Sequence, residues 1–269
     1  MRLQPYLSQK LQDYFQDILH YAQQTIQEPD EVEHLHQFRV STRRAQSILR
    51  EFKGCFEPAY LQKSRQLLKR FIKVSNDARD LDVLLLTLSS WDLPDPLHLE
   101  ELQIHLRRAR KEAYGALHEE LAKVPALLYA LLGPKIVCKR SLKKALKDAF
   151  RRSIERLRRL GSSIHSDEEF HRFRVALKRA RYIAELMVQR GLMPPKRLKR
   201  LKALQDLFGQ IQDASVQSRR LLTLAQQEEF DKMTYMAMGK VMADLLERKE
   251  RLKRRLREDL QKRLRALGV

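Results

Sequence analysis

The ten residues at positions 36–45, HQFRVSTRRA, return at positions 171–180 as HRFRVALKRA. Six of the ten positions are identical, and Lys178 replaces Arg43 without loss of charge. A weaker echo joins DARDLDV at 77–83 to QIQDASV at 210–216. Because the two echoes have nearly the same offset, the sequence predicts two similar halves that repeat one structural unit.

The repeated residues lie in a sequence whose pattern is helical throughout. Apolar residues recur at spacings of three and four, and the alternation typical of strands is nearly absent. Gly and Pro residues divide this pattern into segments. We expect an all-α fold of two four-helix bundles, residues 1–132 and 136–269, related by a pseudo-two-fold axis around a central groove. The predicted helices are 5–27, 31–53, 59–89, 97–122, 139–160, 167–190, 195–227 and 229–267, with an additional short one near 126–132.

Composition limits the class of protein. The chain has 269 residues, 43% of them hydrophobic, which is enough for a sizeable core. The two cysteines, Cys55 and Cys138, offer no disulfide framework and no plausible zinc site, so a reducing compartment is expected. No leader and no apolar run of membrane-spanning length is evident. We therefore expect a cytoplasmic protein.

The charge is strongly positive and unevenly distributed. Lys and Arg total 54 against 34 Asp and Glu, a net charge of +20. Residues 1–140 contribute 21 and 18 of these, whereas residues 141–269 contribute 33 and 16. Such an excess predicts attraction to a polyanion, namely nucleic acid, inorganic polyphosphate or an anionic membrane surface. The alternative is that the surplus charge only keeps a helical protein soluble.

Helical geometry places the basic residues of each repeat on one face. At about 100° per residue, His36, Arg39, Arg43 and Arg50 form one stripe, and Phe38 lies on the opposite, apolar stripe. The second repeat places His171, Arg174, Lys178 and Arg181 in the same way. Like charges stacked along a helix repel one another, so a solvent-exposed face normally mixes signs. The pattern predicts a cationic ridge for an extended anion in each half, or else a basic face exposed to solvent.

The residues beside the ridges favour a phosphate chain without bases. Proteins that bind single-stranded nucleic acid interleave basic residues with aromatic platforms. Aromatic residues make up only 7% here, and Phe38 and Phe173 fall on the predicted core stripes. Duplex nucleic acid could still bind through its phosphates, although no helix-turn-helix, zinc-finger or RNP signature is present. Arg, Lys and protonated His suit a ligand made only of phosphate.

The paired motif H-x-x-R-V-x-x-[RK]-R-A resembles the CHAD domain, a histidine-containing α-helical family. The stretches RDLDV at 79–83 and KALQDLFGQIQD at 202–213 fit as well, and the resemblance covers essentially the whole chain, 1–269. It implies a stand-alone CHAD domain with two four-helix bundles around a basic central groove or pore. It also implies binding of long-chain inorganic polyphosphate and recruitment to polyphosphate granules.

The ridges and the resemblance together define the predicted binding residues. Gln46 departs from the pattern because it stands where the second repeat has Arg181, and Asn76 stands in the place of Gly209. The second half is therefore expected to dominate binding. The predicted polyphosphate-binding residues are His36, Arg39, Arg43, Arg44, Arg50, Lys69, His171, Arg174, Lys178, Arg179, Arg181 and Lys202.

No pattern for catalysis accompanies these residues. The sequence lacks metal-ligand spacing, a phosphate-binding Gly-rich loop and a recognisable nucleophile–base arrangement, so we expect no enzyme, metal or cofactor. Asp80 and Asp82 are expected to orient neighbouring Arg side chains. The leucines of the charged run 247–265 are expected to pack on the bundle rather than on a membrane. The alternative functions are nonspecific nucleic-acid binding and an adaptor subunit of a polyphosphate-processing enzyme.

The two repeated histidines carry a prediction of their own. His36 and His171 begin their ridges at the same phase, and we expect both to contact phosphate oxygens, the alternative being structural hydrogen bonds. Imidazole gains its charge near pH 6–7, so affinity for a polyanion should rise as the pH falls through about 6 to 7.

Overall fold

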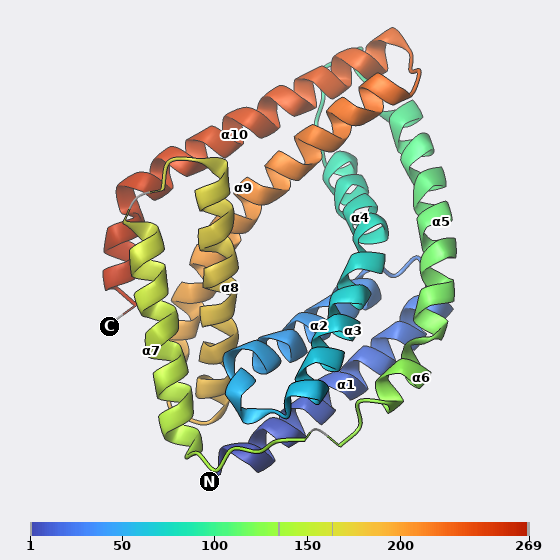
Figure 1. The fold of residues 1–269 in the computed structure, drawn as a ribbon. Coiled ribbons are helices and arrows are strands. Elements are labelled where there is room, and N and C mark those ends of the chain that lie inside the picture. The colour runs from blue at the N-terminus through green and yellow to red at the C-terminus, as the bar shows by residue number, and fades with distance from the viewer. Residues whose placement is uncertain (1, 134, 163, 268–269) are drawn as a thin grey trace. The chain divides into compact units, whose positions relative to one another are not determined.

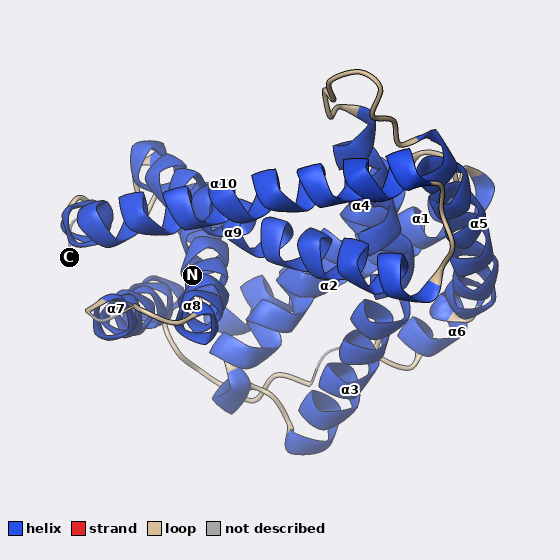
Figure 2. Cartoon of the chain, turned by 90° about the horizontal axis from the view of Figure 1, so that it is seen from above, coloured by secondary structure: helices blue, strands red, loops and turns tan. Residues whose placement is uncertain are grey.

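The computed structural model describes residues 2–133, 135–162 and 164–267, and these are almost entirely helical (Figures 1 and 2). Within them no strand occurs beyond isolated bridges, which confirms the all-α class. The pseudo-two-fold axis and the central groove stay predictions. The elements are α1 (Leu3–Gln27), α2 (Val32–Glu51), the 3-10 helix η1 (Lys53–Cys55), α3 (Pro58–Val74), α4 (Asn76–Ser89), α5 (Glu100–Ala122), α6 (Val124–Tyr129), α7 (Leu142–Gly161), α8 (Asp167–Gln189), α9 (Pro195–Gln227) and α10 (Lys232–Arg265).

The helices form two compact units. Unit 1 comprises Met1–Trp91 and Leu102–Leu142, and unit 2 comprises Asp92–Glu101 and Lys143–Val269. The short helix predicted near 126–132 is present as α6. No helix in the described part of the chain has the length and apolarity that crossing a bilayer would require.

Unit 1 is built around α2. This helix packs along α1 and on α3, and its predicted apolar stripe is buried, with Phe38 and Leu49 fully inaccessible. Phe38 meets Phe71 of α3 at a ring-centroid distance of 5.9 Å. Packing of the apolar stripe against these neighbours fixes the rotation of α2 about its own axis. The sequence pattern therefore sets the orientation of the helix.

The prediction of one helix over 59–89 is wrong in one respect: α3 ends at Val74, and after Ser75 a second helix, α4, begins at Asn76. The hydroxyl of Ser75 donates to the carbonyl of Phe71 at 2.8 Å, and Ser75 itself is buried. A guanidinium from α2, that of Arg39, donates to the Ile72 carbonyl at 3.1 Å and to Ser75 Oγ at 2.6 Å. These bonds satisfy groups at the helix end, which a buried break requires. In unit 2, α9 runs unbroken through the matching positions.

Unit 2 is organised by α9, which packs against α8 and α10 (Figure 1). Phe173 of α8 stacks on Phe208 of α9, with ring centroids 4.6 Å apart. The predicted packing of the C-terminal leucines is confirmed, because Leu252, Leu256, Leu260 and Leu264 of α10 are buried. Gly161, at the end of α7, fits beneath them: a Cβ there would lie 2.8 Å from Leu264 Cδ1.

Carboxylates cap two helices of unit 2. Ser166 and Glu169 form a capping box at the start of α8, and Glu169 Oε2 accepts from the backbone N–H groups of Ser166 and His165, each at 2.9 Å. These two bonds lower the pKa of Glu169 to about 2. At the start of α10, bonds from the hydroxyl and backbone N–H of Thr234 lower the pKa of Asp231 to about 2.

Neutralising these two caps should make the acid stability of unit 2 less dependent on pH. A carboxylate whose pKa is depressed in the folded state stabilises it above the unfolded pKa and loses this contribution as pH falls through the folded value. The double variant Glu169→Gln with Asp231→Asn should therefore have a lower urea midpoint than wild type at near-neutral pH. The difference between the urea midpoints of wild type and the variant should disappear as the pH falls from about 4.5 to about 2. Circular dichroism at a series of pH values measures both midpoints, and a difference that stays constant would contradict the assignment.

Candidate anion-binding sites

The first candidate site lies in unit 1, between α2 and α3. A cavity of about 330 Å³ is lined by Gln46 and Arg50 of α2 and by Arg65, Gln66 and Lys69 of α3. We call it the α2–α3 groove. Its lining carries three cations and two amides, with no carboxylate and no aromatic ring. Because like charges repel, three cations around one cavity favour an anion between them.

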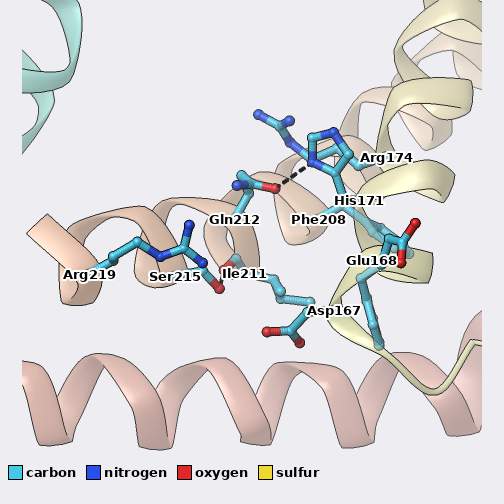
Figure 3. Close-up of a pocket in the computed structure, with 10 residues that line it drawn as sticks. Asp167, Glu168, His171, Arg174, Phe208, Ile211, Gln212, Ser215 and Arg219 are labelled. Atoms are coloured by element: carbon cyan, nitrogen blue, oxygen red, sulfur yellow. Dashed lines mark hydrogen bonds between the residues drawn. The ribbon is translucent and has the colours of Figure 1, made fainter. Parts of the chain in front are cut away.

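The second candidate site lies in unit 2, between α8 and α9 (Figure 3). This α8–α9 pocket, a cavity of about 260 Å³, contains His171 and Arg174 on one wall and Gln212 and Arg219 on the other. His171 Nδ1 lies 3.0 Å from Gln212 Oε1. An amide oxygen only accepts, so Nδ1 carries the proton and Nε2 is left for another contact. The remaining lining residues are Asp167, Glu168, Phe170, Phe208, Ile211 and Ser215.

Arg39 is a predicted binding residue whose donors are used inside unit 1. Its exposed fraction is only 9%, and besides Ile72 and Ser75 it donates to Asn76 Oδ1 at 3.1 Å. Burial, with the nearby charge of Arg43, lowers the pKa of Arg39 to about 10. A buried cation needs such partners. The geometry gives Arg39 a positioning role, since it fixes α2 against the junction of α3 and α4.

Arg181 is also held by its own unit. Its Nε donates to Gln205 Oε1 at 2.6 Å, its Nη1 pairs with Glu185, and its guanidinium lies 4.4 Å from the Tyr182 ring centroid. The Arg181 and Glu185 pair stands where unit 1 has Gln46 and Arg50. Unit 2 thus pairs the arginine at this level of the ridge within its own helix, whereas in unit 1 Arg50 lines the α2–α3 groove and lies 3.6 Å from Glu51 Oε1.

The other predicted residues are distributed along the same helices. The structure brings Arg50 together with Lys69 in the α2–α3 groove, and His171 together with Arg174 in the α8–α9 pocket. Lys202 is exposed on α9 and lines neither cavity. Half-buried positions on α2 or α8, outside both cavity linings, are occupied by His36, Arg43, Arg44, Lys178 and Arg179.

Two residues missed by sequence reasoning line the cavities. Arg65 precedes Lys69 by one helical turn, and this i, i+4 spacing was a usable signal. Arg219 lies two turns beyond Gln212 on α9, outside either repeated motif, so the repeat gave no reason to choose it.

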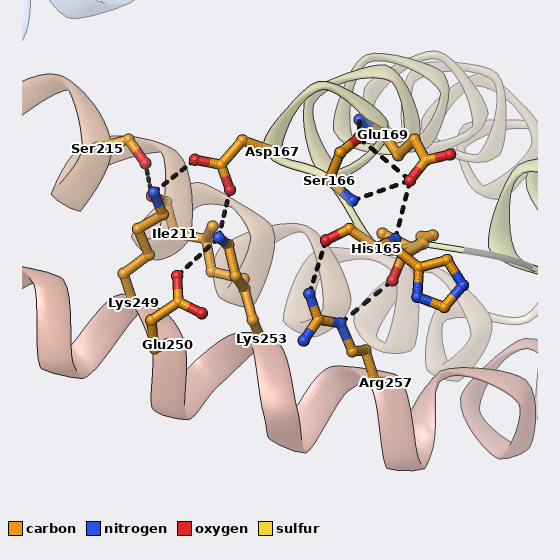
Figure 4. A network of polar contacts seen from close by, with 11 residues as sticks. His165, Ser166, Asp167, Glu169, Ile211, Ser215, Lys249, Glu250, Lys253 and Arg257 are labelled. Atoms are coloured by element: carbon orange, nitrogen blue, oxygen red, sulfur yellow. Dashed lines mark hydrogen bonds and ion pairs between the residues drawn. The ribbon is translucent and has the colours of Figure 1, made fainter.

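Helix α10 holds the start of α8 in place beside the second pocket (Figure 4). Lys249 Nζ donates to Asp167 Oδ2 at 2.5 Å, and Lys253, only 5% exposed, pairs with the other oxygen of the same carboxylate. Hydrogen bonds from both lysines lower the pKa of Asp167. Arg257 donates to the backbone carbonyls of Ile164 and His165. Several cations of the basic C-terminal half are thus used within the unit.

The RDLDV stretch performs the structural task expected of its carboxylates. Asp82, on α4, is fully buried and accepts from Arg110 Nε at 2.8 Å and from the Tyr114 hydroxyl at 2.9 Å, both on α5. Arg79 Nη1 lies 3.9 Å from the second carboxylate oxygen. Burial raises the pKa of Asp82, and the bonds from Arg110 and Tyr114 oppose that rise. Across the described residues, His, Cys, Asp and Glu side chains form no group of three suited to a metal ion.

The fold and these cavities define an all-α protein with a basic groove between α2 and α3 and a pocket of mixed charge between α8 and α9. The CHAD domain family model matches residues 9–222, so the chain belongs to the CHAD domain family. The family is associated in general with polyphosphate binding.

Two solved structures share the fold. The CHAD domain from the plant Ricinus communis aligns with a TM-score of 0.70 and 25% identity, over 97% of this chain and 92% of that one. PptA from Streptomyces chartreusis aligns with a TM-score of 0.67 and 17% identity, over 95% and 98%. No curated protein matches the sequence significantly.

Proposed function

We propose that this protein binds long-chain inorganic polyphosphate without catalysis, and that binding directs it to polyphosphate granules in the cytoplasm. The observation that carries the proposal is the lining of the α2–α3 groove, which holds Arg50, Arg65 and Lys69 with no carboxylate and no aromatic side chain. The α8–α9 pocket adds His171, Arg174 and Arg219. Each site lies within one unit, so a long chain has two separate places to bind.

The chemistry of the groove suits phosphate better than bases. Arg makes paired, charge-assisted hydrogen bonds to phosphate oxygens, and Lys supplies a compact positive charge. The amides of Gln46 and Gln66 add uncharged donors. A single-stranded nucleic acid gains much of its affinity from stacking on aromatic rings, and this groove has none to offer.

The same lining supports binding rather than turnover. The α2–α3 groove contains no imidazole, hydroxyl, thiol or carboxylate, so it lacks the usual groups for nucleophilic or general acid–base catalysis. Its residues supply charge and hydrogen-bond donors only. On this proposal the bound chain leaves unchanged, and any processing enzyme would be a separate partner.

A competition assay tests the proposal. Labelled long-chain polyphosphate is displaced by unlabelled polyphosphate, by single-stranded RNA and by duplex DNA, all matched in total charge. Two salt concentrations are needed because electrostatic affinity changes steeply with salt. We expect RNA and DNA to displace the label at concentrations at least ~10-fold higher than polyphosphate does. Equal displacement by all three would identify a nonspecific nucleic-acid-type binder. Conversion of the chain to shorter products would refute the absence of catalysis.

A further inference from the structure

Two segments that are distant in the sequence pair through their backbones in unit 1. The Glu57 N–H donates to the Lys135 carbonyl at 3.0 Å, and the Val137 N–H donates to the Cys55 carbonyl at 2.8 Å. These bonds form an antiparallel bridge between Phe56 and Ile136. Both of these side chains are buried, so the pairing is anchored in the core of the unit.

The bridge places a cysteine on each segment. Cys55 ends η1 immediately before the bridge, and Cys138 follows it two residues after Ile136. Both are free thiols, and because the Val137 N–H donates to the Cys55 carbonyl, Cys138 is the next residue after the one bonded to Cys55. Cys55 is only 3% exposed, whereas Cys138 is half-buried. A disulfide requires its two sulfurs to approach from contact to about 2.05 Å. Cysteines on two paired backbone segments have the short Cα–Cα separation that a disulfide needs.

We propose that Cys55 and Cys138 form an oxidation site, in which the paired backbone segments hold two thiols ready to close as an intramolecular disulfide when the protein meets hydrogen peroxide. In a reducing compartment the pair stays as two thiols. Intracellular disulfides are usually transient, so the bond is a reversible modification rather than a permanent part of the fold.

Exposure sets the order of the chemistry. Burial raises the pKa of Cys55 to about 12, which keeps it a thiol and sheltered from solvent. Cys138 therefore reacts first: its sulfur attacks one peroxide oxygen, the O–O bond breaks, and a water molecule and a sulfenic acid result. Cys55 sulfur then attacks Cys138 sulfur, the S–O bond breaks, and the departing hydroxide takes the Cys55 proton as a second water. Two thiols lose two electrons, and one peroxide is reduced to two waters.

Closing the bond would constrain a large part of unit 1. The covalent ring would run from Cys55 to Cys138 and enclose α3, α4, α5 and α6. Cross-linking a long loop stabilises a fold mainly by restricting its unfolded chain. The bond would also fix the end of α2, because η1 follows α2 and begins three residues after Arg50 of the α2–α3 groove.

Oxidation of the reduced full-length protein tests the site. The protein is treated with hydrogen peroxide, quenched, unfolded and labelled with a maleimide. We expect both thiols to become unavailable, the intact mass to fall by two hydrogen atoms, and dithiothreitol to restore both labels. The melting temperature reported by Trp91 fluorescence should rise by roughly 5 °C after oxidation.

Two variants keep the result interpretable. Cys138→Ser should form no intermolecular disulfide, show no rise in melting temperature on oxidation and keep Cys55 unlabelled until the protein unfolds. Cys55→Ser should leave a sulfenic acid on Cys138 that dimedone traps. A cross-linked dimer, over-oxidation of Cys138 to a sulfinic acid in the wild type, or two labels remaining after peroxide would each overturn the proposal.

Discussion

Replacing Asp82 by alanine is expected to lower the free energy of unfolding of unit 1 by about 3–5 kcal/mol. The carboxylate is fully buried and accepts from both Arg110 and Tyr114, which anchor α5 on α4. Its removal leaves the buried Tyr114 hydroxyl without its acceptor, and leaves the half-buried Arg110 guanidinium only Asp30 and the Pro29 carbonyl. Breaking a buried ion pair by deleting one partner costs far more than the pair contributes, because the other charge stays behind.

Urea unfolding followed by Trp91 fluorescence measures this loss, since Trp91 is the single tryptophan and lies two residues beyond α4. Asp82→Asn should lose less than the alanine variant, because the amide still offers an acceptor to Arg110. Arg108→Ala is the control: it breaks an exposed pair with Glu112 on the same helix, α5, and should change stability by no more than about 0.5 kcal/mol. A loss below about 1 kcal/mol for Asp82→Ala would mean that the network is not the anchor described here.

The helices were predictable because their apolar spacing is regular and their ends carry Pro or Gly. The stripe through Phe38 and Leu49 is buried as the wheel predicts, and the short helix α6 lies where expected. Proline begins both α3 and α9, at Pro58 and Pro195, positions that suit its missing N–H.

The break at Ser75 could not be read from the same spacing. No Gly or Pro stands there, and the helical periodicity continues across it. The break is stabilised by Arg39, which lies 36 positions away and bonds to the Ile72 carbonyl and Ser75 Oγ. The helical wheel places Arg39 on a ligand-binding ridge. A wheel gives the direction of a side chain but not the depth at which a neighbouring helix buries it.

Of the predicted binding residues, four lie in the linings of the two cavities. Arg50, Lys69, His171 and Arg174 line cavities, and the first two share one groove. The guanidinium of Arg181 is already paired with the carboxylate of Glu185. That pairing was visible as an i, i+4 spacing in the sequence.

Charge counting also overstates what the second half can offer a ligand. Its large positive excess includes Lys249 and Lys253, which share the carboxylate of Asp167, and Arg257, which bonds to two backbone carbonyls. These cations stabilise the packing of α10 on α8. Residues 1–140 carry 21 Lys and Arg against 18 Asp and Glu, yet they place three cations around a cavity whose lining has no carboxylate. The positions of the cations therefore indicate a binding site better than the net charge does. Whether the second half dominates binding can be measured.

Removing the three cations of the α2–α3 groove should separate these contributions. The variant Arg50→Gln, Arg65→Gln and Lys69→Gln replaces three charged groups by neutral amides that can still donate hydrogen bonds. Hydrogen bonds to charged groups contribute about 1.5–3 kcal/mol when buried, and less at exposed positions such as these. We expect affinity for long-chain polyphosphate to fall at least ~10-fold at low salt, with a shallower dependence of affinity on salt because fewer counterions are released.

A second triple variant supplies the matched control. Arg107→Gln, Arg108→Gln and Lys111→Gln remove the same charge from exposed positions on α5, away from the groove lining. If binding depends on the groove, this variant should keep near-wild-type affinity while its net charge equals that of the first. Equal losses in both variants would show that total charge decides binding. If neither variant loses affinity, the α8–α9 pocket of unit 2 becomes the principal site. The same test is then made by replacing Arg174 and Arg219 with Gln.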